Sequence, residues 1–174
     1  MKHICIIGGT GMLAEVSKWY ADNNHLVSVI ARNEEKMNRM KDSCSKPENI
    51  KAIYLDYRDA TDLHNALRKS IEVYGPLTEA VVWLHSDGLH ALSTVFEWIE
   101  EKSNVWQVIG SQANAEHLKK QYYPEKDLEH KIIQLGFVRE NDRQRWLTNV
   151  EIADGVIRSI LAGQSYSLVG EISS

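Results

Sequence analysis

The sequence predicts an α/β fold built on a doubly wound parallel sheet with helices on both faces. Two observations support this prediction. Short apolar segments alternate with helix-like segments along the chain, which is the pattern of parallel strands joined by helical crossovers. The first apolar segment ends in a cluster of glycines that opens directly into a helical pattern, as in a strand–turn–helix unit that binds a phosphate.

The composition indicates one domain over residues 1–174. The chain has 174 residues, 43% of them hydrophobic, which is enough to bury a substantial core. Its formal net charge is -4 with both signs interspersed, so we expect neither a nucleic-acid partner nor a membrane partner. The first apolar run is too short for a signal peptide or a membrane span, and two cysteines make no disulfide framework. We therefore expect a cytoplasmic protein.

The first half of the chain indicates three strand–helix pairs. The strands are expected at 3–7, 25–31 and 50–56, where Ile, Leu and Val recur. The helices are expected at 12–23, 33–44 and 61–74. The first and third helices repeat apolar residues at helical spacing, whereas the second is polar, with Asn33 as a suitable cap.

The second half continues the alternation. Strands are expected at 79–84, 105–109, 131–138 and 165–169. Helices are expected at 89–102, 113–121 and 148–162. Thr148 and Glu151 have the spacing of a capping box at the start of the last helix.

The glycine cluster is the strongest functional signal. Read from Gly9 to Ala14, it is G-x-G-x-x-A, one form of the dinucleotide-binding fingerprint. Its backbone N–H groups and the positive end of the following helix dipole favour a pyrophosphate. The sequence therefore predicts a Rossmann-like fold with a cofactor-binding turn. The residues of this turn are Gly8, Gly9, Thr10, Gly11, Met12 and Leu13.

The end of the second strand bears on which dinucleotide is bound. Arg32 and Asn33 stand where an acidic residue usually binds the adenosine ribose hydroxyls. A guanidinium can bind the 2′-phosphate of NADP in a charge-assisted fork, which favours NADP over NAD. Two alternatives stay open. Arg32 can be an ordinary solvated residue, and the nearby Glu34 and Glu35 leave NAD as the other cofactor.

The next two strand ends supply further cofactor candidates. Leu55 and Asp56 lie at the end of the third strand, where the Asp56 carboxylate can accept a hydrogen bond from the adenine amino group or cap the following loop or helix. His85 follows the fourth strand, where the backbone passes beside the cofactor ribose; it can equally be an ordinary polar residue.

These residues together resemble the short-chain dehydrogenase/reductase family. The resemblance rests on the run from Gly8 to Leu13, on Arg32 with its neighbours, and on Leu55 with Asp56. It implies that NAD or NADP binds across the carboxyl ends of the strands. It also implies a homo-oligomer, since many members are dimers or tetramers.

The resemblance also implies a Ser, Tyr and Lys that act on a carbonyl. Ser111 follows the fifth strand, and Tyr122 with Lys126 has the spacing Y-x-x-x-K. Pro124 lies between the last two, where a helix interior would lose about 3 kcal/mol. The spacing is therefore more consistent with chance than with a shared helical face. Ser111 can instead cap the helix that follows it.

The remaining polar residues indicate no independent site. No metal-ligand spacing occurs, and His117 and His130 are expected on solvated surfaces. Arg139, Arg143 and Arg145 lie in an expected polar loop, where they are either solvated or meet an anionic substrate.

We therefore expect an NAD(P)(H)-binding reductase that acts on a small carbonyl substrate. A non-catalytic NADP(H)-binding sensor or scaffold is the alternative. Two weaker alternatives are a protein that binds another nucleotide at the same turn and a reductase that works without an acid/base triad.

Overall fold

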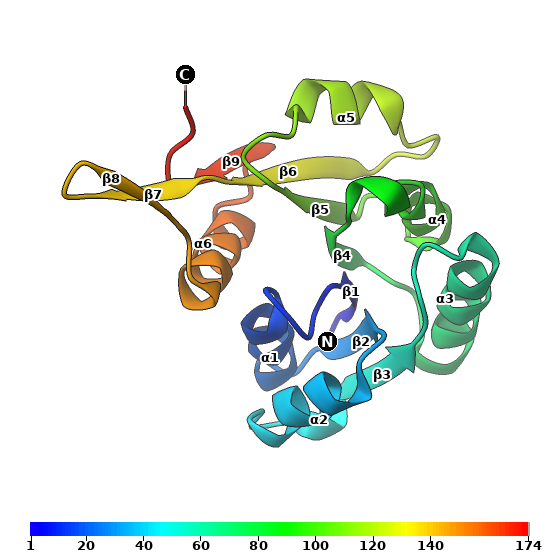
Figure 1. Ribbon diagram of the computed structural model, residues 1–174. Helices are drawn as coiled ribbons and strands as arrows, with labels where there is room; N and C mark the ends of the chain where they lie inside the picture. The colour runs from blue at the N-terminus through cyan, green and yellow to red at the C-terminus, as the bar shows by residue number, and fades with distance from the viewer. Residues whose placement is uncertain (174) are drawn as a thin grey trace.

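The computed structural model describes residues 1–173 and contains one seven-stranded sheet in the order β3-β2-β1-β4-β5-β6-β9 (Figure 1). Every neighbouring pair in this sheet is parallel. Its strands are β1 (His3–Ile7), β2 (Leu26–Ala31), β3 (Ile50–Tyr54), β4 (Glu79–Trp83), β5 (Asn104–Ile109), β6 (Glu129–Leu135) and β9 (Tyr166–Val169). The predicted doubly wound parallel sheet is confirmed.

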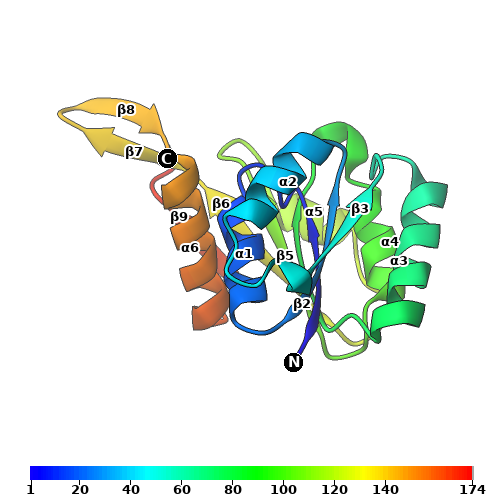
Figure 2. The same ribbon diagram turned by 90° about the horizontal axis from the view of Figure 1, so that it is seen from below.

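Helices cover both faces of the sheet. They are α1 (Ala14–Asp22), α2 (Glu34–Asp42), α3 (Ala60–Tyr74), α4 (Ala91–Trp98), α5 (Ala115–Gln121) and α6 (Asn149–Ala162), with short 3-10 helices η1 (Pro47–Asn49) and η2 (Ser86–Gly88). Helices α1, α2 and α6 lie on one face, and α3, α4 and α5 lie on the other (Figures 1 and 2). No helix among residues 1–173 is both long enough and apolar enough to cross a membrane.

The central strand β1 shows how the sequence builds these two layers. All five of its residues are buried. Ile4 and Ile6 join the apolar cluster beneath α1, α2 and α6, while Cys5 and Ile7 join the cluster beneath α3 and α4. Successive side chains of a strand point to opposite faces, so a continuous apolar run supplies both layers at once.

The segment after β6 differs from the prediction. The strand expected over 131–138 ends at Leu135. The polar loop expected after it is instead an antiparallel hairpin of β7 (Phe137–Glu140) and β8 (Arg143–Trp146). This hairpin extends from the body of the protein (Figures 1 and 2). Gly136 makes the break, because a Cβ there would lie 2.0 Å from the Glu171 carbonyl oxygen. Asn141 and Asp142 form the tip with φ of 49° and 63°, the left-handed geometry that two-residue hairpins need.

The helix expected over 89–102 is also shorter than predicted. It is α4, which ends at Trp98 because Ile99 adopts an extended backbone. The chain then turns through Lys102, whose φ is 63°, and enters β5. Apolar spacing at Leu92, Val95 and Phe96 identifies the helix but does not reveal where it stops.

His130 is buried, not solvated as predicted. Because β6 begins at Glu129, two residues earlier than expected, His130 becomes an inward-facing strand residue. Its Nε2 lies 2.9 Å from Oε1 of Gln107, and its ring packs edge-on against Phe96. Burial, with a smaller contribution from the Lys119 charge, lowers the pKa of His130 from 6.5 to about 4.

This shift predicts a loss of stability in mild acid. Between pH 6.5 and pH 4 the unfolded chain binds a proton at His130 that the folded chain does not, so the free energy of unfolding falls as the pH falls through this range. We expect the His130 contribution to drop by about 1–2 kcal/mol between pH 7 and pH 5. Urea unfolding at the two pH values measures it. His130→Leu should reduce the pH dependence by this amount, and equal pH dependence in wild type and His130→Leu contradicts the prediction.

Candidate dinucleotide-binding site

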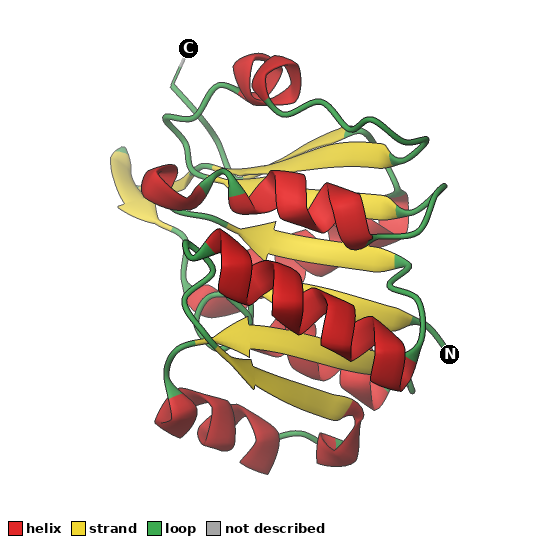
Figure 3. Ribbon diagram, turned by 90° about the vertical axis from the view of Figure 1, so that its right-hand side faces the viewer, coloured by secondary structure: helices red, strands yellow, loops and turns green. Residues whose placement is uncertain are grey.

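The glycine turn sits where the strand order reverses. Strand β1 lies between β2 and β4, so Gly8–Leu13 leaves the carboxyl edge of the sheet between the two outward-running halves. Figure 3 shows the carboxyl ends of the strands gathered at one edge. Ligands of open α/β sheets bind in the crevice at this topological switch point.

Two glycines let the backbone make this turn. Gly8 has a φ of 88°, which side chains disfavour, and a Cβ there would also lie 3.2 Å from the Cβ of Trp83. At Gly9 an added Cβ would lie 2.5 Å from Oγ of Ser17 and 2.9 Å from side-chain carbons of Ile6 and Val29. Gly9 therefore allows α1 to pack directly on β1 and β2. The Ser17 hydroxyl donates to the Gly9 carbonyl at 3.0 Å and holds the turn against the helix.

The N-terminus of α1 is open to a ligand. The helix begins at Ala14, two residues later than predicted, and in the described chain no side chain caps it, because Leu13 occupies the N-cap. The Leu13 side chain is fully buried, so only its backbone faces the turn. Gly11 has nothing within 4 Å of where its Cβ would be. Exposed N–H groups at the positive end of a helix dipole are suited to an anion.

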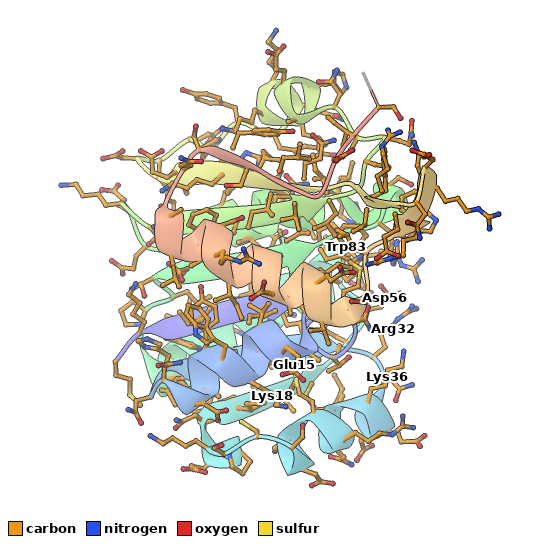
Figure 4. All side chains as sticks on the ribbon, turned by 90° about the vertical axis from the view of Figure 1, so that its left-hand side faces the viewer. Glu15, Lys18, Arg32, Lys36, Asp56 and Trp83 are labelled. Atoms are coloured by element: carbon orange, nitrogen blue, oxygen red, sulfur yellow. The ribbon has the colours of Figure 1, made fainter. Side chains whose placement is uncertain are left out.

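Arg32 and Asp56 meet at the neighbouring strand ends. Arg32 follows β2 and Asp56 follows β3, and Nη1 of Arg32 lies 3.7 Å from Oδ2 of Asp56 (Figure 4). The Arg32 side chain is 66% exposed, so this ion pair is loose. The two residues predicted from sequence therefore lie together, with the guanidinium free to bind another anion.

Arg58, which the sequence interpretation did not select, binds Asp56 more tightly. Its Nε donates to Oδ1 of Asp56 at 3.0 Å and its Nη2 donates to Oδ2 at 2.8 Å, while its backbone N–H also donates to Oδ1. These bonds lower the pKa of Asp56 to about 2. The carboxylate therefore caps its own loop, the second of the two roles considered for it. The signal was present as an Asp followed two residues later by an Arg at a strand end.

Arg58 also joins the loops that follow β3 and β4. Its Nη1 donates to Oδ2 of Asp87 at 2.8 Å. Beside it, the backbone N–H of His85 donates to the Tyr57 hydroxyl at 2.9 Å. Gly88 is required here, since a Cβ would lie 2.4 Å from the Tyr57 ring. The His85 backbone is thus fixed at the carboxyl edge, while its side chain is exposed.

The other adenosine-side candidates have structural roles. Asn33 accepts a hydrogen bond from the backbone N–H of Lys36 at 2.9 Å and so caps α2, as its sequence position predicts. Leu55 is half-buried against the apolar cluster and its N–H donates to the Ala31 carbonyl at 3.2 Å. Their side chains are committed to the fold.

Ser111 lies at the carboxyl edge, as predicted. It is half-buried just after β5, and Asn114, not Ser111, caps α5 by accepting from the His117 N–H. Gln134 holds the backbone around Ser111, donating to the carbonyls of Gly110 at 3.2 Å and Ala113 at 2.9 Å. The Ser111 hydroxyl is therefore not needed as a cap.

Tyr122 and Lys126 lie at the opposite edge of the sheet, so their predicted catalytic pairing with Ser111 is not formed. Helix α5 runs from the carboxyl edge to the amino edge and ends before Tyr122, which packs into the apolar cluster under α4. Nζ of Lys126 donates to the carbonyls of Glu97 and Ile99 at the end of α4, at 2.6 and 2.8 Å. Tyr122 therefore has a packing role, and Lys126 caps the end of α4.

Alanine substitutions at Gly9 and Gly11 test how tightly each position of the turn is packed. Gly9→Ala should lower the free energy of unfolding by about 2 kcal/mol, because the Cβ has no room beside Ser17, Ile6 and Val29. Gly11→Ala should change it by less than about 0.5 kcal/mol, because the space is open. Denaturant unfolding of both variants measures the difference, and equal losses would show that the turn is not packed this way.

Replacement of Lys126 tests its structural role. Lys126→Met keeps the aliphatic stem but removes the ammonium from the last carbonyls of α4, so stability should fall by about 1 kcal/mol. Dinucleotide affinity, measured by titration, should stay within error of wild type. Weaker dinucleotide binding in this variant would place Lys126 in the site after all. Lys120→Met, at an exposed position on α5, is the matched control.

Comparisons with known proteins agree with this architecture. No family model matches the sequence, and no curated protein matches it. Among solved structures, a short-chain dehydrogenase from Oenococcus oeni has a TM-score of 0.74 at 11% identity, covering 97% of this chain and 95% of that one. A short-chain dehydrogenase/reductase from Serratia marcescens has 0.69 at 17% (96% and 95%). A betaketoacyl-ACP reductase from Bacteroides thetaiotaomicron has 0.69 at 16% (99% and 96%). The chain therefore has the fold of the short-chain dehydrogenases/reductases.

Proposed function

We propose that this protein is an NADP(H)-binding oxidoreductase of the short-chain dehydrogenase/reductase type, acting on a small carbonyl compound. The observation that carries the cofactor assignment is the loosely held Arg32 guanidinium beside an Asp56 carboxylate that Arg58 binds more closely. The solved structures with this fold include dehydrogenases and a reductase, which supports the reaction class.

The electrostatics at the adenosine end favour a 2′-phosphate. An unpaired carboxylate at Asp56 would repel this dianion, but the fork from Arg58 offsets its charge. Among residues 1–173 the ionic contact of Arg32 is with Asp56 at 3.7 Å, which leaves most of its donors available. The alternative in which an acidic residue at the start of α2 favours NAD has less support from the structure. Glu35 is bound to Arg39 of its own helix at 2.6 Å and so turns along α2.

The residues present fit a pyridine dinucleotide. The backbone from Gly9 to Leu13 would hold the pyrophosphate at the open end of α1, and Arg32 would hold the 2′-phosphate. The backbone at His85 would lie beside a ribose, and Ser111 would lie near the nicotinamide end. When bound, the cofactor supplies a hydride.

A non-catalytic NADP(H)-binding module is the second candidate. It is favoured by the position of Lys126, which leaves the Tyr-Lys pair away from the carboxyl edge. Oxidation of NADPH in the presence of carbonyl compounds separates the two, since the module would bind NADPH without consuming it. The homo-oligomer and the cytoplasmic location stay predictions. Sedimentation velocity measures the oligomeric state.

Removing the Arg32 charge tests the cofactor assignment. NADPH should raise the melting temperature of the wild-type protein more than NADH at equal concentration, because a ligand of the folded state stabilises by mass action. Arg32→Gln should weaken NADPH binding about 10-fold or more, the loss of a charged hydrogen bond, and leave NADH binding unchanged. Arg68→Gln, an exposed arginine on α3 that pairs with Glu72 of its own helix, is the matched control. An unchanged preference in Arg32→Gln would show that Arg32 does not contact the phosphate.

A further inference from the structure

We propose that the open edge of the sheet at β3 binds a short acidic segment of another protein, which adds to the sheet as an extra strand. A groove with a volume of about 660 Å³ lies at this edge, and we call it the edge groove. It is lined by β3, by α3, and by η1 with the end of α2. Its lining includes Lys41, Glu48, Lys51, Lys69, Val73 and Tyr74.

Strand β3 is the outermost strand on its side of the sheet. It pairs with β2 along Ile50–Tyr54, and among residues 1–173 no strand pairs with its other side. Figure 1 shows β3 at the end of the sheet, with α2 and α3 to either side of it. An edge strand presents a row of backbone groups that can pair with another chain. The sheet can therefore accept a further strand at this edge.

The backbone of β3 shows which groups are free to pair. The N–H of Leu55, just after the strand, donates to the Ala31 carbonyl of β2 at 3.2 Å. Backbone groups of successive strand residues point to opposite sides, so those of Ile53 also face β2, whereas those of Ala52 and Tyr54 face outward. Within residues 1–173 the outward N–H and C=O groups of Ala52 and Tyr54 have no hydrogen-bond partner. An added strand would supply these partners.

Helix α3 gives the edge groove an apolar wall. Ala66, Lys69 and Val73 line the groove and lie three or four residues apart, so they share one face of the helix. The side chain of Val73 is 68% exposed, and that of Tyr74, the last residue of α3, is 37% exposed. An apolar side chain on an added strand would cover both, and this burial would contribute to binding.

The charges of the edge groove favour an acidic partner. Lys41, Lys51 and Lys69 come from α2, β3 and α3, and none of the three forms an ion pair within residues 1–173. Nζ of Lys51 lies 5.3 Å from the centroid of the Tyr74 ring, which keeps its charge at the groove. Glu48 is the one carboxylate among the lining residues that the structure describes. The chain as a whole has a net charge of -4, so this positive excess is local.

A second copy of this chain is less suited to the edge groove. Pairing of β3 with β3 of another copy would bring the lysines of both grooves together, and like charges that face each other in a sheet are destabilising. Lysine on an edge strand is a common protection against such pairing. An acidic strand meets the same lysines as groups of opposite charge. The occupant that the charges favour is therefore a different, acidic chain.

The pattern of the partner follows from the geometry of a strand. Successive side chains of an added strand point to opposite faces of the sheet, so one set faces α3 and the other faces α2 and η1. Apolar side chains suit the wall at Val73 and Tyr74, and carboxylates suit the three lysines. A segment in which acidic and apolar residues alternate provides both. In strand addition the backbone hydrogen bonds give affinity, and the alternate side chains give specificity.

Three blocked hexapeptides test the proposal on the full chain. The first alternates glutamate and valine, and the second has lysine in place of glutamate. The third repeats the first with N-methyl groups on its backbone amides, which removes its N–H donors. Each is titrated into the ¹⁵N-labelled protein and followed by NMR. We expect the glutamate peptide to bind about 10-fold or more tightly than the other two, and to shift the amide signals of Ala52 and Tyr54.

Variants of the protein locate the binding at the edge groove. Lys69→Glu, at an exposed position, should weaken binding of the glutamate peptide about 5-fold. Lys120→Glu, exposed on α5 and outside the groove, is the matched control and should leave it unchanged. Ala52→Pro removes an outward N–H and should also weaken binding about 5-fold. Circular dichroism checks that the variants fold. If Ala52→Pro does not fold, the N-methylated peptide tests the same hydrogen bonds on the unaltered protein.

Several results would overturn the proposal. They are no binding of the glutamate peptide at about 1 mM, equal binding of the glutamate and lysine peptides, equal binding of the N-methylated peptide, or unchanged affinity in Lys69→Glu. Sedimentation velocity of the free protein tests the second copy. Self-association that Ala52→Pro abolishes and Lys120→Glu retains would assign the edge to another copy and would also overturn the proposal. The thermal shift with NADPH tests the dinucleotide site separately, because that site shares no residue with the lining of the edge groove.

Discussion

The structure depends most on the close packing of α1 against β1 and β2 at Gly9. No Cβ fits there, because Ser17, Ile6 and Val29 already occupy the space. This contact sets the angle at which the chain leaves the central strand, and so aims the uncapped end of α1 at the carboxyl edge. The position of the candidate anion site in the first βαβ unit is thus a consequence of core packing. On the β4 side of the turn, Trp83 leaves little room for a side chain at Gly8, where a Cβ would lie 3.2 Å from the Trp83 Cβ.

A second constraint acts through charge. Arg58 binds the carboxylates of Asp56 and Asp87, which follow different strands, and so joins two loops of the carboxyl edge. Exposed ion pairs contribute little to stability one at a time. Their importance here is positional, because Arg58 holds the Asp56 carboxylate at 2.8 Å while Arg32 lies 3.7 Å from it. A single guanidinium outside the glycine motif thereby shapes the potential that a dinucleotide would meet.

The segment that follows β5 shows that sequence spacing alone can mislead. Tyr122 and Lys126 have the sequence spacing Y-x-x-x-K. They do not share a helical face, because α5 ends before Tyr122 and Pro124 lies between the two residues. The lysine then satisfies carbonyls of α4, which are otherwise left without intrahelical partners. The space at the carboxyl edge beside α5 is a cavity with His117 on its wall.

The sequence by itself determined the alternation of elements, the parallel sheet, the glycine turn and the caps at Asn33 and Thr148, because these depend on periodicity and on bonds within a few residues. Only the tertiary structure decided that Arg58 also pairs with Asp87, that His130 is buried beside Gln107, and that β6 gives way to a hairpin at Gly136. Each of these depends on where a strand ends or on which residue lies opposite across the fold. A shift of one or two residues at a strand boundary exchanges inside for outside, and no local pattern in the chain records it.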